Sequence, residues 1–259
     1  MHPRLALIGG EEFSDGFEAV HAGLLADLEG RNRRVVYLPT AATDDGPAAV
    51  EHWCDLARQK LSALGAIVEA PRVVDVASAN DERHAQRVAE ADWVYLGGGY
   101  AHVAARILRG TRVLAALHEA KSRGTLIAGA SAGAMWMGEQ SIVITPEHLQ
   151  EVGRIWETGA PPDWDPPAPP LIAGLGWLPH TVCAPHFDRP WFSRRWLERG
   201  LLPNDFTLIG IDEHTALVAT DGDWEVRGRG AVTILRANQQ ARRYTVGEKV
   251  DLWLLHETG

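Results

Sequence analysis

Residues 124–138, near the middle of the chain, read GTLIAGASAGAMWMG. An apolar run of the kind that forms a buried strand gives way at Ser131 to residues of helical character, with glycines two positions before and after the serine. At an abrupt strand-to-helix turn the corner residue projects its side chain outward, and glycine fits best at the crowded flanking positions. The Gly-x-Ser-x-Gly pattern of residues 129–133 therefore predicts an elbow with an exposed hydroxyl. The alternative is a plain turn of small residues.

Outward from this elbow, short apolar runs alternate with longer stretches of helical spacing. The runs in the first half are Leu5–Ile8, Val35–Leu38, Ala66–Val68, Trp93–Leu96 and Thr125–Ala128. Strands that are apolar throughout and alternate with amphipathic helices are typical of a parallel sheet covered on both faces. We therefore expect an α/β fold, with a doubly wound, mostly parallel sheet and helices on both faces. Further strand-like runs follow at Leu208–Ile211, Ala216–Ala219, Trp224–Val226, Ala231–Leu235 and Val250–Leu254.

A proline-rich segment interrupts this pattern. Residues 141–170 end in TGAPPDWDPPAPP, which can form neither a helix nor a central strand. Apolar runs resume directly afterwards, so we interpret residues 141–170 as a surface loop or lid. The chain is then one α/β domain over residues 1–259.

Composition and net charge restrict the classes of molecule that the protein is expected to bind. The chain has 259 residues, 46% of them hydrophobic, and a net charge of −9, which argues against a nucleic-acid backbone or an anionic membrane surface as the main partner. No stretch approaches the roughly 20 apolar residues that cross a bilayer, and no secretory signal is recognisable. Cys54 and Cys183 lie in apolar surroundings and are expected to be reduced. We expect a cytoplasmic protein, with a homodimer as the default assembly.

A serine nucleophile needs a base, usually a histidine that a carboxylate orients. His186 in VCAPHFD follows a short apolar run and so lies at a strand end, where ligands bind in such sheets. In LIGIDEHTALV, Asp212 and Glu213 also follow a strand, and we choose Glu213 as the orienting carboxylate. The alternative for this acidic pair is an ordinary turn between two strands.

Backbone N–H groups are the usual stabilisers of an oxyanion. Ala132, directly after the serine, offers one, and a second would come from LGGGYAH, where Gly97, Gly98 and Gly99 let the backbone come close to a ligand. His102 stands where the dinucleotide-binding pattern needs its third glycine, so phosphate binding is the weaker alternative. No zinc-binding spacing is present, and we expect neither a metal nor a cofactor.

Taken in order, LIGGEE, VVYLPTAA, YLGGG, GASAGA, GLGWLP…PHF and GIDEHTALV cover most of the chain. In these motifs the sequence resembles the serine-peptidase family of aspartyl dipeptidase (peptidase E) and cyanophycinase. The resemblance implies a fold like that of class I glutamine amidotransferases. It also implies a Ser-His-Glu triad of Ser131, His186 and Glu213, with the oxyanion hole at Gly98 or Gly99 and Ala132.

Departures from the family pattern bear on the substrate. Tyr100 stands near a place where members usually carry Asn or Asp, and Ala184 removes a carboxylate that is present in cyanophycinases. We therefore expect dipeptidase-like hydrolysis of short peptides, with acidic residues as the candidate preference, and assign Tyr100 and Arg189 to substrate binding. Arg189 would hold an acidic side chain or a peptide terminus, unless it, like Arg194 and Arg195, is a solvent-facing helix charge. The alternatives are a cyanophycinase-like or other hydrolase, and a non-catalytic amidotransferase-like binding domain.

Overall fold

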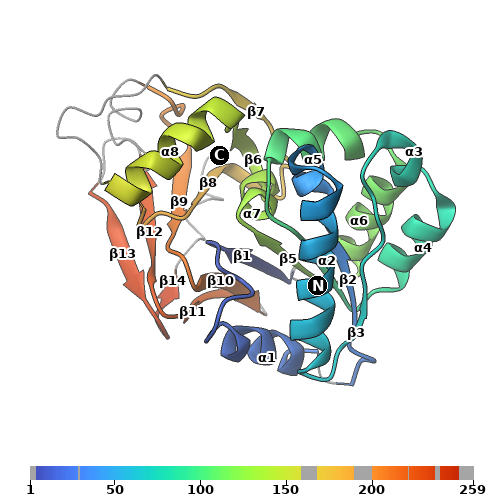
Figure 1. The fold of residues 1–259 in the computed structure, drawn as a ribbon. Helices are drawn as coiled ribbons and strands as arrows, with labels where there is room; N and C mark the ends of the chain where they lie inside the picture. The colour runs from blue at the N-terminus through green and yellow to red at the C-terminus, as the bar shows by residue number, and fades with distance from the viewer. Residues whose placement is uncertain are drawn as a thin grey trace.

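The computed structural model describes residues 4–28, 30–158, 168–189, 200–220, 222–236 and 240–250. Two β-sheets and the helices around them make up this part of the chain (Figure 1). The helices are α1 (Glu18–Ala26), a 3-10 helix (Thr40–Asp45), α2 (Pro47–Ser62), α3 (Val76–Ala79), α4 (Glu82–Glu90), α5 (Ala101–Leu108), α6 (Arg112–Ser122), α7 (Ala132–Met137) and α8 (Pro146–Thr158).

The first sheet has the strand order β14-β11-β10-β1-β5-β4-β2-β3. Its strands are β1 (Leu5–Ile8), β2 (Arg34–Leu38), β3 (Ile67–Glu69), β4 (Trp93–Leu96), β5 (Leu126–Ala130), β10 (Thr215–Thr220), β11 (Asp223–Gly228) and β14 (Lys249–Val250). All pairings from β1 to β3 are parallel, and those among β1, β10, β11 and β14 are antiparallel. The doubly wound α/β class expected from the sequence is confirmed.

Side-chain alternation along each strand divides the core of this sheet. Ala6 and Ile8 of β1 pack with apolar residues of α1 and α2, whereas Leu5 and Leu7 pack with those of α3 to α7. All four side chains are fully buried. Because successive strand residues point to opposite faces, an uninterrupted apolar run lets one strand bind helices on both sides.

The second sheet was not expected as a separate unit. Its order is β13-β12-β9-β8-β6-β7, made of β6 (Gly138–Ile142), β7 (Leu171–Ala173), β8 (Leu178–Pro185), β9 (Thr207–Ile211), β12 (Ala231–Arg236) and β13 (Arg242–Thr245). The β6–β8 and β8–β9 pairings are parallel, whereas β6–β7, β9–β12 and β12–β13 are antiparallel. The chain leaves this sheet after β9, returns to the first sheet with β10 and β11, and comes back with β12.

The expected loop over residues 141–170 needs a correction. Residues 146–158 form the helix α8, and β6 extends to Ile142. Pro146 is the first residue of α8, a position where its missing N–H costs no hydrogen bond. The proline-rich residues 159–167 lie outside the described part of the chain.

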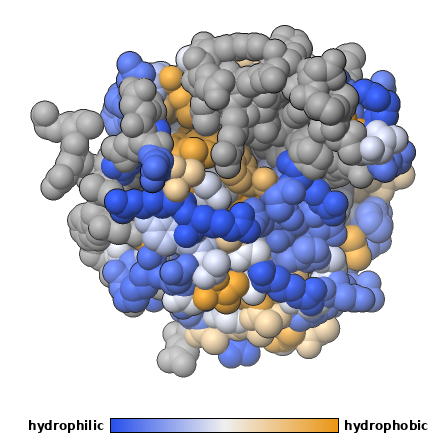
Figure 2. All heavy atoms as spheres, turned by 90° about the vertical axis from the view of Figure 1, so that its left-hand side faces the viewer, coloured by the Kyte–Doolittle hydropathy of each residue, from blue (hydrophilic) through white to orange (hydrophobic). Residues whose placement is uncertain are grey.

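The face on the side of β13 is mainly hydrophilic where residues are described, with apolar side chains in small separate patches (Figure 2). Arg242 and Arg243 of this terminal strand are exposed. Charged side chains on an edge strand disfavour pairing with another chain's strand. Among the described helices, none has the length and apolar character needed to span a membrane.

Candidate active site

Ser131 lies at a sharp turn between β5 and α7. Its backbone is strained, with φ 50° and ψ −114°. The two flanking glycines explain how the turn fits. A Cβ at Gly129 would lie 2.5 Å from the carbonyl carbon of Gly133, and a Cβ at Gly133 would lie 2.3 Å from the oxygen of Leu96. The Gly-x-Ser-x-Gly spacing is therefore a steric requirement of this elbow.

The turn after β1 joins the two sheets at the site. Ser131 N–H donates to the Ile8 carbonyl at 3.0 Å, and His186 N–H donates to the Gly9 carbonyl at 2.9 Å. His186 follows β8 of the second sheet, whereas Ser131 follows β5 of the first. A Cβ at Gly10 would lie 2.2 Å from Cε1 of the His186 ring, so the backbone of this turn packs directly against the imidazole. The backbone thus fixes the serine and the histidine relative to one another.

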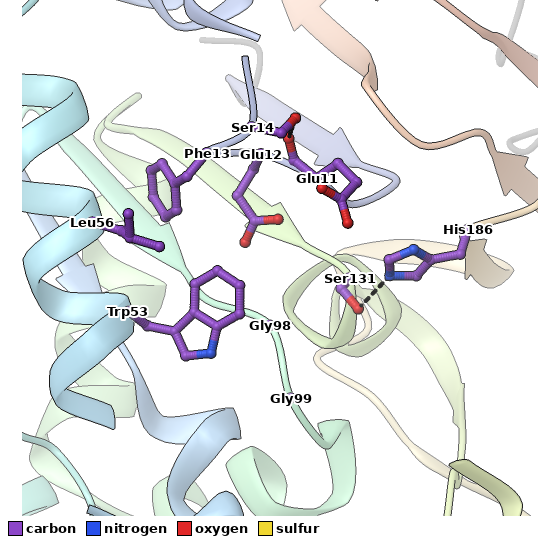
Figure 3. A pocket seen from close by; sticks show the side chains of 10 residues that line it. All are labelled: Glu11, Glu12, Phe13, Ser14, Trp53, Leu56, Gly98, Gly99, Ser131 and His186. Carbon is purple, nitrogen blue, oxygen red and sulfur yellow. Dashed lines mark hydrogen bonds between the residues drawn. The ribbon is translucent and has the colours of Figure 1, made fainter. Parts of the chain in front are cut away.

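The side chains of Ser131, His186 and Glu213 form a continuous hydrogen-bonded chain. His186 Nε2 lies 3.0 Å from Ser131 Oγ, drawn as a dashed line in Figure 3, and His186 Nδ1 lies 2.9 Å from Glu213 Oε1. With Nδ1–H donating to the carboxylate, Nε2 is left to accept the serine proton. Burial raises the pKa of Glu213, but hydrogen bonds from His186 and Arg189 outweigh it, so that the net pKa is lowered. The carboxyl is therefore ionised at neutral pH.

Two neighbours hold Glu213 in place. Arg189 Nε and Nη2 both lie 2.8 Å from Glu213 Oε2, the oxygen that His186 does not use. The Glu213 N–H donates to Asp188 Oδ1 at 2.8 Å. Asp212 instead accepts from the Ala231 N–H at 3.0 Å and pairs with Arg243 at 2.8 Å. Of the two adjacent acids, Glu213 thus contacts the histidine and Asp212 stabilises the strand β12.

The candidate oxyanion donors surround Ser131. A Cβ at Gly98 would lie 3.4 Å from Ser131 Cβ, so the turn after β4 passes directly beside the serine. Within the described chain, the N–H groups of Gly98 and Gly99 donate to no backbone carbonyl. Ala132 is the first residue of α7, where N–H groups have no partner inside the helix.

The two residues predicted to bind substrate, Tyr100 and Arg189, both contact other side chains of the protein. Tyr100 is buried at the start of α5, and its side chain hydrogen-bonds to Asp45. Arg189 reaches the site, but its contact there is with Glu213. Their roles toward a substrate stay predictions, and Arg194 and Arg195 lie outside the described residues. In the described ranges, no cluster of three or more His, Cys, Asp or Glu could hold a metal ion.

A cavity of about 390 Å³ opens at Ser131. It is lined by Glu11, Glu12, Phe13, Ser14, Trp53, Leu56, Gly98, Gly99, Ser131 and His186 (Figure 3). The sequence analysis gave no role to any side chain in the turn after β1. Glu12 is the notable omission, because it is only 5% exposed and its carboxyl points into the cavity.

Burial raises the pKa of the Glu12 carboxyl against smaller opposing effects of its own backbone N–H and of His186. The folded state therefore binds this proton more tightly than the unfolded chain, and ionisation costs stability as the pH rises through the folded-state pKa. Glu12→Gln, which cannot ionise, should unfold at higher urea concentration than the wild type at about pH 8. This advantage should vanish towards about pH 4, near the ordinary glutamate pKa. Urea unfolding across this pH range measures it.

The matched control is Glu119→Gln on α6, an exposed side chain whose ion pair with Arg123 is also exposed. It should show no such pH-dependent gain. A Glu12→Gln protein less stable than the wild type at about pH 8 would contradict the expected cost of the buried charge.

Comparison with known proteins adds to this geometry. The sequence model of peptidase family S51 matches residues 5–227. A solved structure of a peptidase from an acI-B1 Actinobacterium is 27% identical, with a TM-score of 0.79, covering 96% of this chain and 97% of its own. A putative peptidase E protein from Listeria monocytogenes EGD-e shares the fold at 16% identity and a TM-score of 0.58, covering 88% and 99% of the two chains. No curated protein matches the chain.

Proposed function

Since this chain belongs to peptidase family S51 and is a serine peptidase, we propose that it hydrolyses short peptides through a Ser131–His186–Glu213 triad. The observation that carries the proposal is the hydrogen-bonded chain from Ser131 Oγ through both nitrogens of His186 to Glu213, at 3.0 and 2.9 Å. The cavity of about 390 Å³ beside the serine suits a peptide of a few residues.

In this mechanism Ser131 Oγ attacks the peptide carbonyl while His186 Nε2 accepts its proton. The tetrahedral oxyanion accepts hydrogen bonds from Ala132 N–H and from Gly98 or Gly99 N–H. His186 then gives the proton to the leaving amine, and a water that His186 deprotonates releases the acyl group from Ser131. Glu213 fixes the imidazole tautomer and stabilises its charged form.

We do not extend the proposal to a preference for acidic residues. The guanidinium of Arg189 is engaged with Glu213, and two carboxyl groups, Glu11 and Glu12, line the cavity. A further negative charge would be repelled there. Location in the cytoplasm and assembly as a homodimer stay predictions.

A fluorophosphonate probe tests the proposal, because an activated serine hydroxyl attacks its phosphorus, expels fluoride and is left phosphonylated. We expect one label per chain, at Ser131 by peptide mass spectrometry. Ser131→Ala is the control that should remain unlabelled. A wild-type protein that takes up no label would favour the non-catalytic binding domain.

A further inference from the structure

The cavity extends from Ser131 to the side away from His186, which lines its other end. In Figure 3, Glu12, Phe13, Trp53 and Leu56 are on the side of Ser131 away from His186. His186 must protonate the leaving amine, so the part of the substrate beyond the scissile bond lies on the histidine side. The acyl part, which becomes attached to Ser131, therefore lies in the cavity toward Glu12.

Glu12 is close enough to meet the first residue of that acyl part. The position of a Cβ at Gly98 would lie 3.4 Å from Ser131 Cβ and 3.9 Å from Glu12 Oε1. In an acyl-enzyme, three bonds separate the serine oxygen from the α-nitrogen of the acyl residue, a span of roughly 3 to 4 Å. An α-ammonium group would thus lie between Ser131 and the Glu12 carboxylate.

Within the described residues, no ion pair balances the charge of the Glu12 carboxylate. No Lys or Arg of the described chain is paired with it, and its surroundings include the buried Tyr37 and Tyr95. A carboxylate that is 95% removed from solvent is costly unless a cation accompanies it, and a bound ammonium would supply that charge.

We propose that Glu12 binds the free α-ammonium group of the substrate, which makes the enzyme specific for cleavage after an N-terminal residue. This inference rests on the proposed serine peptidase function. Phe13, Trp53 and Leu56 form the apolar wall beside Glu12, and the side chain of the N-terminal residue lies against them. The substrate class is a short peptide with an unblocked, apolar first residue.

The test compares Leu-Ala with N-acetyl-Leu-Ala, which differ in the charge of the α-nitrogen. We expect the wild-type kcat/KM to be about 10- to 100-fold higher for Leu-Ala than for N-acetyl-Leu-Ala, because a hydrogen bond to a charged group contributes a factor of this size. In Glu12→Gln the ratio of the two kcat/KM values should fall to near one, mainly because kcat/KM for Leu-Ala decreases. Glu119→Gln on α6 is the control that should keep the wild-type ratio.

Three outcomes would overturn the assignment: an unchanged ratio in Glu12→Gln, loss of the ratio in Glu11→Gln instead, or faster cleavage of N-acetyl-Lys-Ala than of Leu-Ala. The last would mean that Glu12 binds a side-chain cation.

A binding measurement separates this inference from the proposed function. Fluorophosphonate labelling of the wild type tests the nucleophile alone, whatever Glu12 does. Calorimetry of Leu-Ala binding to Ser131→Ala needs no turnover, and adding Glu12→Gln should weaken binding about tenfold or more. Equal affinity in the two proteins would refute the role of Glu12 even if Ser131 is labelled. Weakened binding would support it even if no peptide is cleaved.

Discussion

Ser131→Ala will lower kcat/KM for a cleaved peptide by about 10⁴-fold or more, the loss that follows removal of a triad nucleophile. The reason is the 3.0 Å hydrogen bond from Ser131 Oγ to His186 Nε2, which has no counterpart once the hydroxyl is gone. Alanine at φ 50° bears the same backbone strain as serine, so the fold should be retained. Steady-state kinetics, with circular dichroism of the same samples, measure both expectations.

A double variant sharpens this experiment. Residues that act as one catalytic unit show non-additive losses. His186→Ala alone should cost about as much as Ser131→Ala, and the pair should cost little more than either. Losses that multiply would show that the two residues act independently, against the triad.

Glu213→Gln should lower kcat by about 10³- to 10⁴-fold. Glutamine keeps the shape of the side chain but loses its charge, and its amide can donate to His186 Nδ1 where the carboxylate accepts at 2.9 Å. That reversal favours the imidazole tautomer whose proton is on Nε2, which cannot accept the serine proton. The KM should change much less than kcat, because Glu213 acts through His186.

Asp212→Asn is the matched control for this variant. Asp212 is the adjacent carboxylate and is similarly buried, but it contacts Ala231 N–H and Arg243 instead of the histidine. Asp212→Asn should lower the stability to urea and leave kcat within a few-fold. If kcat falls equally in both variants, the loss comes from a disturbed strand end and not from the missing charge of Glu213.

Much of the first sheet could be predicted because its signals are local. Strands such as β4 are buried on both faces and so appear as uninterrupted apolar runs. The elbow was predictable for the same reason, since the steric limits at Gly129 and Gly133 arise within five residues. The side chain of Glu213, rather than that of Asp212, meets His186, as the sequence interpretation chose.

The rest depends on pairing between distant segments. The apolar runs of β9 and β10 look alike in the sequence, yet the two strands belong to different sheets. The difference comes from their partners, because β9 pairs with β8, whereas β10 pairs with β1, which is more than 100 residues away in the chain. The helix α8 was obscured by the prolines that follow it. Glu12 carried a signal, an acid in the turn after a strand, but its burial depends on segments distant in sequence that line the same cavity.

The return of the chain from β9 to β10 beside β1 has a consequence for biosynthesis. The hydroxyl of Ser131 and the imidazole of His186 come from different sheets, and β10, which pairs with β1 of the first sheet, comes after β9 in the chain. A nascent chain that has emerged only as far as α7 holds its serine without a base. The hydrogen-bonded side chains of Ser131, His186 and Glu213 can therefore come together only after the segment that ends with Glu213 has been synthesised.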